Sequence, residues 1–486
     1  MKRLLPLSAC VLVCLAAGCM VGPNYKRPAA ITAPVFKEAP TDPAPASDGW
    51  KPIQPSDQAQ KGDWWLVYQD TQLDALEAQV DEANQTLKIA EQTFRLARAA
   101  IGIARSNEVP TVGAGASVSS VRESTNEPYF LPTLANNGTG DFRLPLDLNY
   151  EIDLWGRIRR GVTYARAEAQ ASAADMESAR LSLHAELATD YFGLRGADGQ
   201  TKLLDDTIKA YQDALQLTKD RFDGGLAASS DVTQAETQLE QARVQRTDVE
   251  VQRAQFEHAI AVLIGKAPAS VTIAPDPINI NPPKVPSIPG LLPSALLERR
   301  PDIAAEERRM AAANEQIGIA KAAYYPSLSL GGLVGMESTS SESWFNWPSR
   351  FWAAGPSISE SIFDGGRRRS LSQQARANYD AAIATYRQTT LQAFQQVEDN
   401  FAAMRILRTE EEQQHRATAA ALESLSTFEE RYEGGLELYL EVVTSQTVAL
   451  ANQRNDIDLM RRQLDVSVLL IKALGGGWSA QQLPKL

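Results

Sequence analysis

The sequence repeats itself, and this repeat constrains the fold more than any other feature of the chain. The motif IGIAR at residues 101–105 recurs as IGIAK at 317–321, and RFDGGL at 221–226 recurs as RYEGGL at 431–436. The two offsets, 317 − 101 = 216 and 431 − 221 = 210, are similar. Motifs that keep both their order and their spacing predict two structurally equivalent halves. We place these halves at residues 66–265 and 302–475.

Each half is expected to contain a very long helix. No proline interrupts residues 156–221 or 366–431, and at 1.5 Å per residue each stretch reaches roughly 95 Å as a helix. Between residues 73 and 104, apolar side chains recur at spacings of three and four, which is typical of a coiled-coil seam. The order expected in each half is a helix, two strands, a very long helix, a tight hairpin and a last helix.

Residues 141–154 predict a long strand with two unlike faces. Apolar residues occupy every second position from Phe142 to Leu154, and charged residues fill most of the positions between them. This pattern is typical of the wall of a water-filled transmembrane β-barrel. Glu360 falls on the apolar face of another predicted strand, so either that strand end lies outside the membrane or a bulge shifts its register. The other predicted strands are 109–120, 326–337 and 351–363.

Four strands cannot close a barrel, and open sheet edges cannot exist in lipid. The predicted fold class is therefore mixed, all-α plus transmembrane β, with several copies of the chain contributing to one barrel. Two copies give eight strands, whose interior is normally filled by side chains, and three copies give twelve strands with a wider lumen. The residues alone leave this number open.

The N-terminus predicts a bacterial lipoprotein. Lys2 and Arg3 precede an apolar run at residues 4–17 that is too short to span a bilayer, and the run ends at Gly18 and Cys19. Residues 1–18 are therefore expected to be a signal peptide, with a covalent N-acyl diacylglycerol on Cys19 that anchors the chain to outer-membrane lipid. An ordinary signal peptide with an incidental cysteine is the alternative. Residues 19–65, which are rich in proline, are expected to form an extended, lipidated N-terminal segment.

Composition and motifs argue against chemistry on this chain. The net charge is −12 and no basic stripe could neutralise phosphates, so nucleic acid is not an expected partner. His184, His258 and His415 occur singly in helical stretches, where they are expected to be helix-surface residues and not metal ligands. We find no catalytic constellation and no nucleotide-binding loop. The sequence therefore predicts that the chain is not an enzyme, needs no cofactor or metal, and depends on a partner for energy.

Several motifs resemble one protein family. They are CMVGPNYKRP at residues 19–28, DWW at 63–65, LPSALLERRPDI at 292–303 and FDGGR at 363–367. Together they are similar to the NodT-type efflux lipoprotein branch of the TolC-like outer-membrane-factor family. The resemblance covers nearly all of the mature chain.

This resemblance implies a homotrimer with a 12-strand β-barrel, continued by a long α-helical barrel into the periplasm. It implies the outer-membrane channel of a tripartite efflux pump, a passive exit duct for drugs or other small toxic compounds. The implied partners are a periplasmic membrane-fusion adaptor and an inner-membrane RND-type pump. Residues 266–301 would form an equatorial linker around the helices, although a flexible linker is the alternative, and residues 476–486 a C-terminal tail.

The glycine turns are the first candidate site. Glycine permits the left-handed conformation that a tight helical hairpin needs, so a purely structural role is sufficient to explain them. By resemblance, these hairpins form the periplasmic mouth of the tube and contact the adaptor. The hairpin-tip residues are Arg221, Gly224, Gly225, Leu226, Arg431, Gly434, Gly435 and Leu436.

The second candidate site follows the turns. Asp231 and Glu441 occupy matched positions of the repeat. In related ducts the acid that matches Glu441 lines the constriction, where three copies would form a carboxylate ring that favours cations. Thr444 stands where many relatives carry a second acid, so the ring is expected to be weaker. The alternative is an acid that complements the dipole at a helix N-terminus.

Two other functions are compatible with parts of the sequence. One is the outer duct of a type I protein-secretion system, and the other is a periplasmic coiled-coil spacer lipoprotein without a pore. The two-faced strand at 141–154 argues against the spacer, and Asp63-Trp64-Trp65 together with the lipoprotein signal favours efflux over protein secretion.

Overall fold

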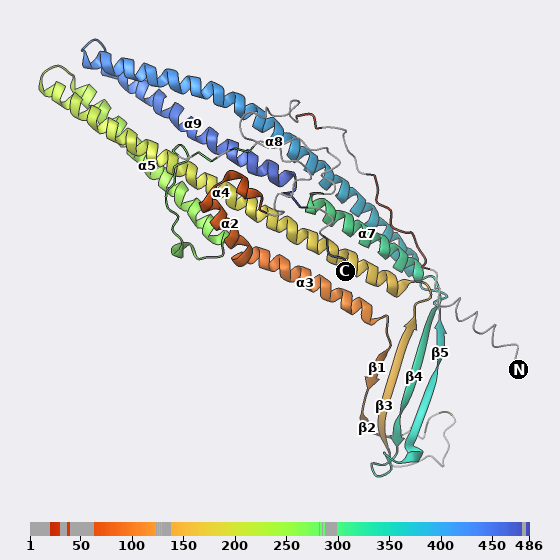
Figure 1. The fold of residues 1–486 in the computed structure, drawn as a ribbon. Coiled ribbons are helices and arrows are strands. Elements are labelled where there is room, and N and C mark those ends of the chain that lie inside the picture. The colour runs from red at the N-terminus through yellow and green to blue at the C-terminus, as the bar shows by residue number, and fades with distance from the viewer. Residues whose placement is uncertain are drawn as a thin grey trace.

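The computed structural model consists of long helices that extend from one end of a β-sheet (Figure 1). It describes residues 20–29, 36–38, 63–122, 124, 126, 128, 138–280, 282–283, 285–286, 299–478 and 483–486. The predicted signal peptide and Cys19 lie outside the described residues, as does much of the predicted 19–65 segment.

The helices of the two halves match in length. α4 and α8 have 67 residues each, α5 and α9 have 35 each, and α3 and α7 have 22 each. The paired helices α4 with α5 and α8 with α9 turn back at the end farthest from the sheet (Figure 1). The bounds are α2 Thr71–Ala83, α3 Gln85–Ser106, α4 Arg157–Asp223, α5 Ser229–Leu263, α7 Pro301–Ala322, α8 Arg367–Glu433 and α9 Tyr439–Ala473.

Among the described residues, no helix is both long enough and apolar enough to cross a membrane.

The first helix of the first half is broken, which the sequence pattern did not predict. A 3₁₀-helix at Trp64–Tyr68 precedes α2, and the chain leaves the helical conformation again at Asn84, which separates α2 from α3. The Asn84 side chain accepts from the Leu87 amide at 2.9 Å and donates to the Leu263 carbonyl at 2.8 Å. A Cβ on Gly265 would lie only 2.3 Å from the Ala83 carbonyl oxygen. The close approach of the end of α5 therefore displaces the chain, and Asn84 caps the helix that follows.

The sheet is antiparallel, with β3 and β4 in its centre. One expectation was wrong, because the last strand ends at Ser359 and not at Phe363. Glu360 therefore lies outside the strand, and the register between β4 and β5 continues without a bulge. The first strand is interrupted opposite Pro145, which has no amide hydrogen to donate. The bounds are β1 Thr111–Ala114, β2 Ser117–Val121, β3 Thr139–Ile152, β4 Ser327–Ser338 and β5 Arg350–Ser359.

The cross-strand register gives the sheet two unlike faces. Directly opposed residues share a face, and the pairs on one face are almost entirely apolar. The other face carries Asp141, Asp147 and Glu151 of β3, and an ion pair of Arg143 with Glu337 at 3.6 Å. Apolar pairs of the first face include Val112 with Leu148, Leu146 with Val334, Leu330 with Pro356, and Val334 with Trp352.

The largest apolar core surrounds the middle of α4. Leu187, Tyr191 and Phe192 of α4 lie there with the end of α5, the end of α9 and α2. The described part of the predicted linker joins this core: the Ile278 amide donates to the Arg195 carbonyl at 3.2 Å. Residues 271–280 thus lie against α4 and α5.

The expectation that His184 is a helix-surface residue was wrong. His184 is 2% exposed, stacks on Trp65 with ring centroids 4.4 Å apart, and contacts a Glu77 carboxylate oxygen at 2.6 Å. Burial lowers the pKa of His184, but the hydrogen bonds to Asp81 and Glu77 outweigh it and raise the pKa to about 9. The imidazolium therefore joins α2 to α4 as a structural ion pair, with Asp81 as its second partner at 3.5 Å.

Candidate functional site: hairpin ends and a two-faced sheet

Each very long helix ends in the same kind of turn. In the first hairpin the Leu226 amide donates to the Arg221 carbonyl at 2.8 Å, and the Gly225 amide donates to the Phe222 carbonyl at 2.9 Å. Gly225 has a φ of +74°, in the left-handed region that favours glycine. This is a Schellman motif, which satisfies carbonyl groups that the helix end leaves without intrahelical partners.

The second hairpin repeats this geometry. The Leu436 amide donates to the Arg431 carbonyl at 2.8 Å, and the Gly435 amide donates to the Tyr432 carbonyl at 3.0 Å. Gly435 has a φ of +72°, whereas Gly434 has an ordinary φ of −72°. Only the second glycine of each Gly-Gly pair is therefore required by the backbone.

Arg221 joins the two hairpins. Its Nη1 donates to the carbonyls of Tyr432 at 2.9 Å and Glu433 at 3.1 Å, and its guanidinium lies 4.6 Å from the centroid of the Tyr432 ring. A cation is favourable at a helix C-terminus and over an aromatic face. The equivalent residue Arg431 instead pairs with Glu437 of its own hairpin at 3.0 Å. The matched positions of these two arginines in the repeat predicted the same role for both, but their contacts differ.

The two matched acids also differ in their contacts. Asp231 accepts a hydrogen bond from the Ala228 amide at 3.3 Å, which is the helix N-terminal role expected of the simpler alternative. Glu441 holds the same position in α9 and is half-buried. Within the part of the chain that the structure describes, its side chain has no hydrogen bond or ion pair. Thr444 is exposed, and its hydroxyl donates to the Leu440 carbonyl at 2.9 Å.

Large apolar side chains are exposed at both hairpin ends. Leu226 is 74% exposed and Leu436 is 75% exposed, and Leu438 lies close by with 71%. In the second hairpin, Tyr432 and Tyr439 are buried with ring centroids 5.2 Å apart, a pair that the sequence pattern did not indicate. Exposed leucines on a packed aromatic base are typical of a contact surface.

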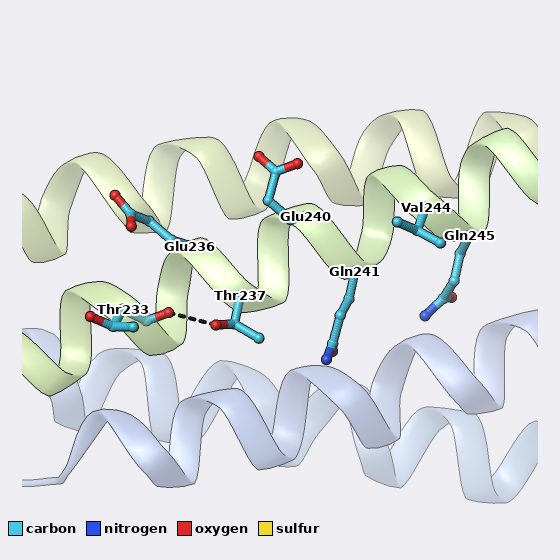
Figure 2. Close-up of a pocket in the computed structure, with 7 residues that line it drawn as sticks. All are labelled: Thr233, Glu236, Thr237, Glu240, Gln241, Val244 and Gln245. Carbon is cyan, nitrogen blue, oxygen red and sulfur yellow. Dashed lines mark hydrogen bonds between the residues drawn. The ribbon is translucent and has the colours of Figure 1, made fainter.

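A shallow groove follows one face of α5 behind the first hairpin end. Its volume is about 570 Å³. In Figure 2 Gln241 and Gln245 point toward the blue helices of the second half, whereas Glu240 points the other way. Glu236 pairs with Lys219 at 3.2 Å. The lining residues are Thr233, Glu236, Thr237, Glu240, Gln241, Val244 and Gln245.

Aromatic side chains lie at both ends of the sheet. Next to the helices, Trp155 stacks on Tyr325 with ring centroids 4.6 Å apart, and its Nε1 donates to the Pro326 carbonyl at 2.8 Å. At the far end, Phe142 lies 5.5 Å from Trp344 between ring centroids. Aromatic residues at both ends of an apolar band are typical of the two membrane interfaces.

An antiparallel sheet with a continuous apolar face, interfacial aromatic residues and long paired helices defines a component of a membrane-embedded duct. Residues 76–266 and 292–476 match the model of the outer membrane efflux protein family. The chain belongs to this family, which consists of efflux channels and not of enzymes. It is thus an outer-membrane efflux channel component that extends into the periplasm.

Individual relatives match along almost their whole length. The outer membrane protein OprJ of Pseudomonas aeruginosa is 30% identical, with 97% of this chain and 95% of the relative covered. The toluene efflux pump outer membrane protein TtgC of Pseudomonas putida is 30% identical, with 98% and 96% covered. The solved structure of the outer-membrane channel OprN superimposes with a TM-score of 0.85 at 28% identity, with 95% of this chain and 100% of that chain covered.

The hairpin geometry predicts unequal effects of substituting the two glycines of a pair. Gly435→Val forces a β-branched residue into the left-handed region and should destabilise the turn by about 1–3 kcal/mol. Hydrogen–deuterium exchange of residues 430–438 should therefore rise. The matched control Gly434→Ala keeps an ordinary backbone conformation and should exchange like the wild type. Equal exchange in the two variants would contradict the assignment.

Proposed function

We propose that three copies of this chain form the passive exit duct of a tripartite efflux pump for drugs or other small toxic compounds. The observation that carries the proposal is the two-faced sheet with open edges at β1 and β2 on one side and β5 on the other. Such a sheet is stable in lipid only when further copies complete a barrel. A periplasmic membrane-fusion adaptor and an inner-membrane RND-type pump supply the connection and the energy.

The repeat supports a particular surface for the proposed contact between copies. α7 packs against α4 at Ala305 and Ala312, which are 1% and 0% exposed. At the offset of 216, the equivalents on α3 are 305 − 216 = 89 and 312 − 216 = 96. These residues, Ile89 and Leu96, are 66% and 73% exposed. α3 therefore lacks a neighbour that α7 has, and a second copy of the chain supplies it.

The repeat also supports a choice of partner surface. The α4 alanines packed against α7 are Ala167 and Ala174. At the offset of 210, their equivalents are 167 + 210 = 377 and 174 + 210 = 384. Ala377 and Ala384 of α8 are both exposed. We infer that Leu96 packs on Ala377 of the next copy, a large side chain on a small one, so that each copy joins the next head to tail and the ring closes.

Three copies would give the proposed ring an open lumen. With one four-stranded segment per copy, three copies make a twelve-strand barrel, wider than the eight-strand barrels that side chains fill. The same rotation would arrange six helical hairpins around one axis as the continuing α-helical barrel. The number three rests on the resemblance to the family and on this need for a lumen.

Cross-linking tests the assembly. Leu96→Cys combined with Ala377→Cys should form disulfides between copies, because paired helix positions bring Cα atoms within bonding range. Non-reducing electrophoresis should show a ladder that ends at three chains. The matched control combines Leu96→Cys with Ala384→Cys, seven residues and roughly 10 Å farther along α8, and should stay largely monomeric. A monomer with both pairs would exclude this interface.

The lipid anchor on Cys19 remains part of the proposal. It is supported by the apolar run that ends at Gly18 and Cys19, and by the position of Val21 at the sheet–helix junction, where its amide donates to the Trp155 carbonyl at 3.1 Å. Cys19→Ser should abolish labelling with radioactive palmitate while cross-linked trimer still forms. Unchanged labelling would disprove lipidation at this residue.

The hairpin ends are proposed as the adaptor contact. They lie at the end of the helices farthest from the sheet (Figure 1), which is the periplasmic end of the duct. The exposed Leu226 and Leu436 offer apolar contacts there. A protein-secretion duct would use the same mouth, but the names of the matched relatives favour efflux.

Glu441 is proposed to line the mouth. Three copies around one axis in a narrow passage would focus a negative field, which favours cations. Glu441→Lys should therefore shift the reversal potential of single channels in planar bilayers toward anion selectivity under a salt gradient. Asp231→Lys is the matched control and should shift it less, because Asp231 already accepts from the Ala228 amide. An unchanged potential in Glu441→Lys would remove Glu441 from the permeation path, and a protein without channels would favour the non-porous spacer.

A further inference from the structure

A buried arginine lies where the two halves of the chain meet beside the sheet. Arg160, in the first turn of α4, is 1% exposed. Its Nη1 lies 2.7 Å from a carboxylate oxygen of Glu315 on α7, which is 7% exposed. Removing two charges from water costs several kcal/mol per ion unless further polar contacts compensate. The position of this ion pair therefore needs an explanation beyond the contact of the two helices.

Further hydrogen bonds of this site go to the N-terminal segment. Arg160 Nε donates to the Val21 carbonyl at 2.9 Å, and Asn314 Nδ2 donates to the Pro23 carbonyl at 3.2 Å. Tyr25 completes the set, because its hydroxyl donates to a carboxylate oxygen of Glu307 at 2.5 Å. The site thus binds the main chain at residues 21 and 23 and a side chain at residue 25.

Three glycines make room for the segment. A Cβ on Gly22, whose φ is +112°, would lie 2.6 Å from Gly318 Cα. A Cβ on Gly318 would lie 2.3 Å from Arg160 Cδ, and a Cβ on Gly156 would lie 2.6 Å from Met20 Cγ. Backbone therefore meets backbone at Gly22 and Gly318, and no larger residue fits on either side.

The repeat predicts a second, equivalent contact, between α3 and α8, and this contact lacks the buried arginine. Gly102 is the counterpart of Gly318, at 318 − 216 = 102, and belongs to α3, which we propose packs against the next copy. The counterpart of Arg160 is Ser370, at 160 + 210 = 370, which has no charge. The arginine site is therefore specific to the contact of α4 with α7. It is not a general requirement of this helix arrangement.

We propose that Arg160, Glu315 and Gly318 form a docking site for the chain's own N-terminal segment, residues 20–25, and that this segment fastens the first half to the second. Because Trp155 accepts from the Val21 amide and stacks on Tyr325, the docked segment begins at the level of the interfacial aromatic residues. A lipid on Cys19 would then enter the membrane at that level. Only this last consequence depends on the proposed lipidation.

Hydrogen–deuterium exchange of the full-length protein in detergent tests the docking site. Arg160→Met with Glu315→Met removes both buried charges together, so that no charge is left unpaired. Gly22→Val instead changes the segment and keeps both charged residues. In both variants we expect exchange of residues 21–25 to rise at least tenfold, while residues 430–438 exchange as in the wild type.

The matched control removes a neighbouring ion pair that does not touch the segment. Arg157 pairs with Glu151 at 2.6 Å, and both side chains are at least one-third exposed. Arg157→Met with Glu151→Met should leave exchange of residues 21–25 unchanged. The proposal is overturned if Gly22→Val, or the Arg160 and Glu315 double variant, exchanges within twofold of the wild type. It is also overturned if the control releases the segment equally, since the effect would then come from any local loss of charge.

Discussion

The open edges of the sheet are the constraint on which the rest of this structure depends. In a bilayer core, backbone groups without partners cost several kcal/mol each, and no water is present to replace the missing hydrogen bonds. One face of the sheet is apolar from β1 to β5, so it belongs in lipid, whereas the charged face needs water. A single copy satisfies neither requirement. The closure by further copies that we propose would satisfy both, because it would pair the edges and enclose the polar face.

Features that depend on local sequence pattern were predictable. The proline-free stretches gave α4 and α8 nearly to the residue, and strict alternation gave β3 within two residues at each end. The glycine turns also agree, because a left-handed residue after a helix is a local requirement of the backbone. Features set by contacts between distant segments were not predictable. Asn84 breaks a helix whose apolar spacing continues without a fault, and the cause lies about 180 residues later, at the end of α5.

Charged residues show the same limit. His184 lies in a helical stretch with nothing around it in the sequence to mark it, yet it is buried between Trp65 and Glu77. The different contacts of Arg221 and Arg431 could not be predicted either, because the two motifs that contain them are nearly the same. For the candidate mouth, the sequence supplied the matched positions of Asp231 and Glu441. It could not say that Asp231 caps its helix while the Glu441 side chain makes no such contact.

In the ring that we propose, duplication would give two kinds of contact between helices, one within a chain and one between copies, and their chemistry need not be the same. Within the chain, alanine meets alanine and a buried ion pair holds an extended segment across the joint. Between copies, the packing that we propose would place isoleucine and leucine against alanine, without the arginine. The two helices of the contact within a chain are tethered, so their meeting does not depend on protein concentration. Association between copies would depend on protein concentration. The larger apolar area of leucine and isoleucine would help to offset the entropy lost on association. This accounts for the bulky side chains at the proposed contact between copies, which would have to form without a covalent connection.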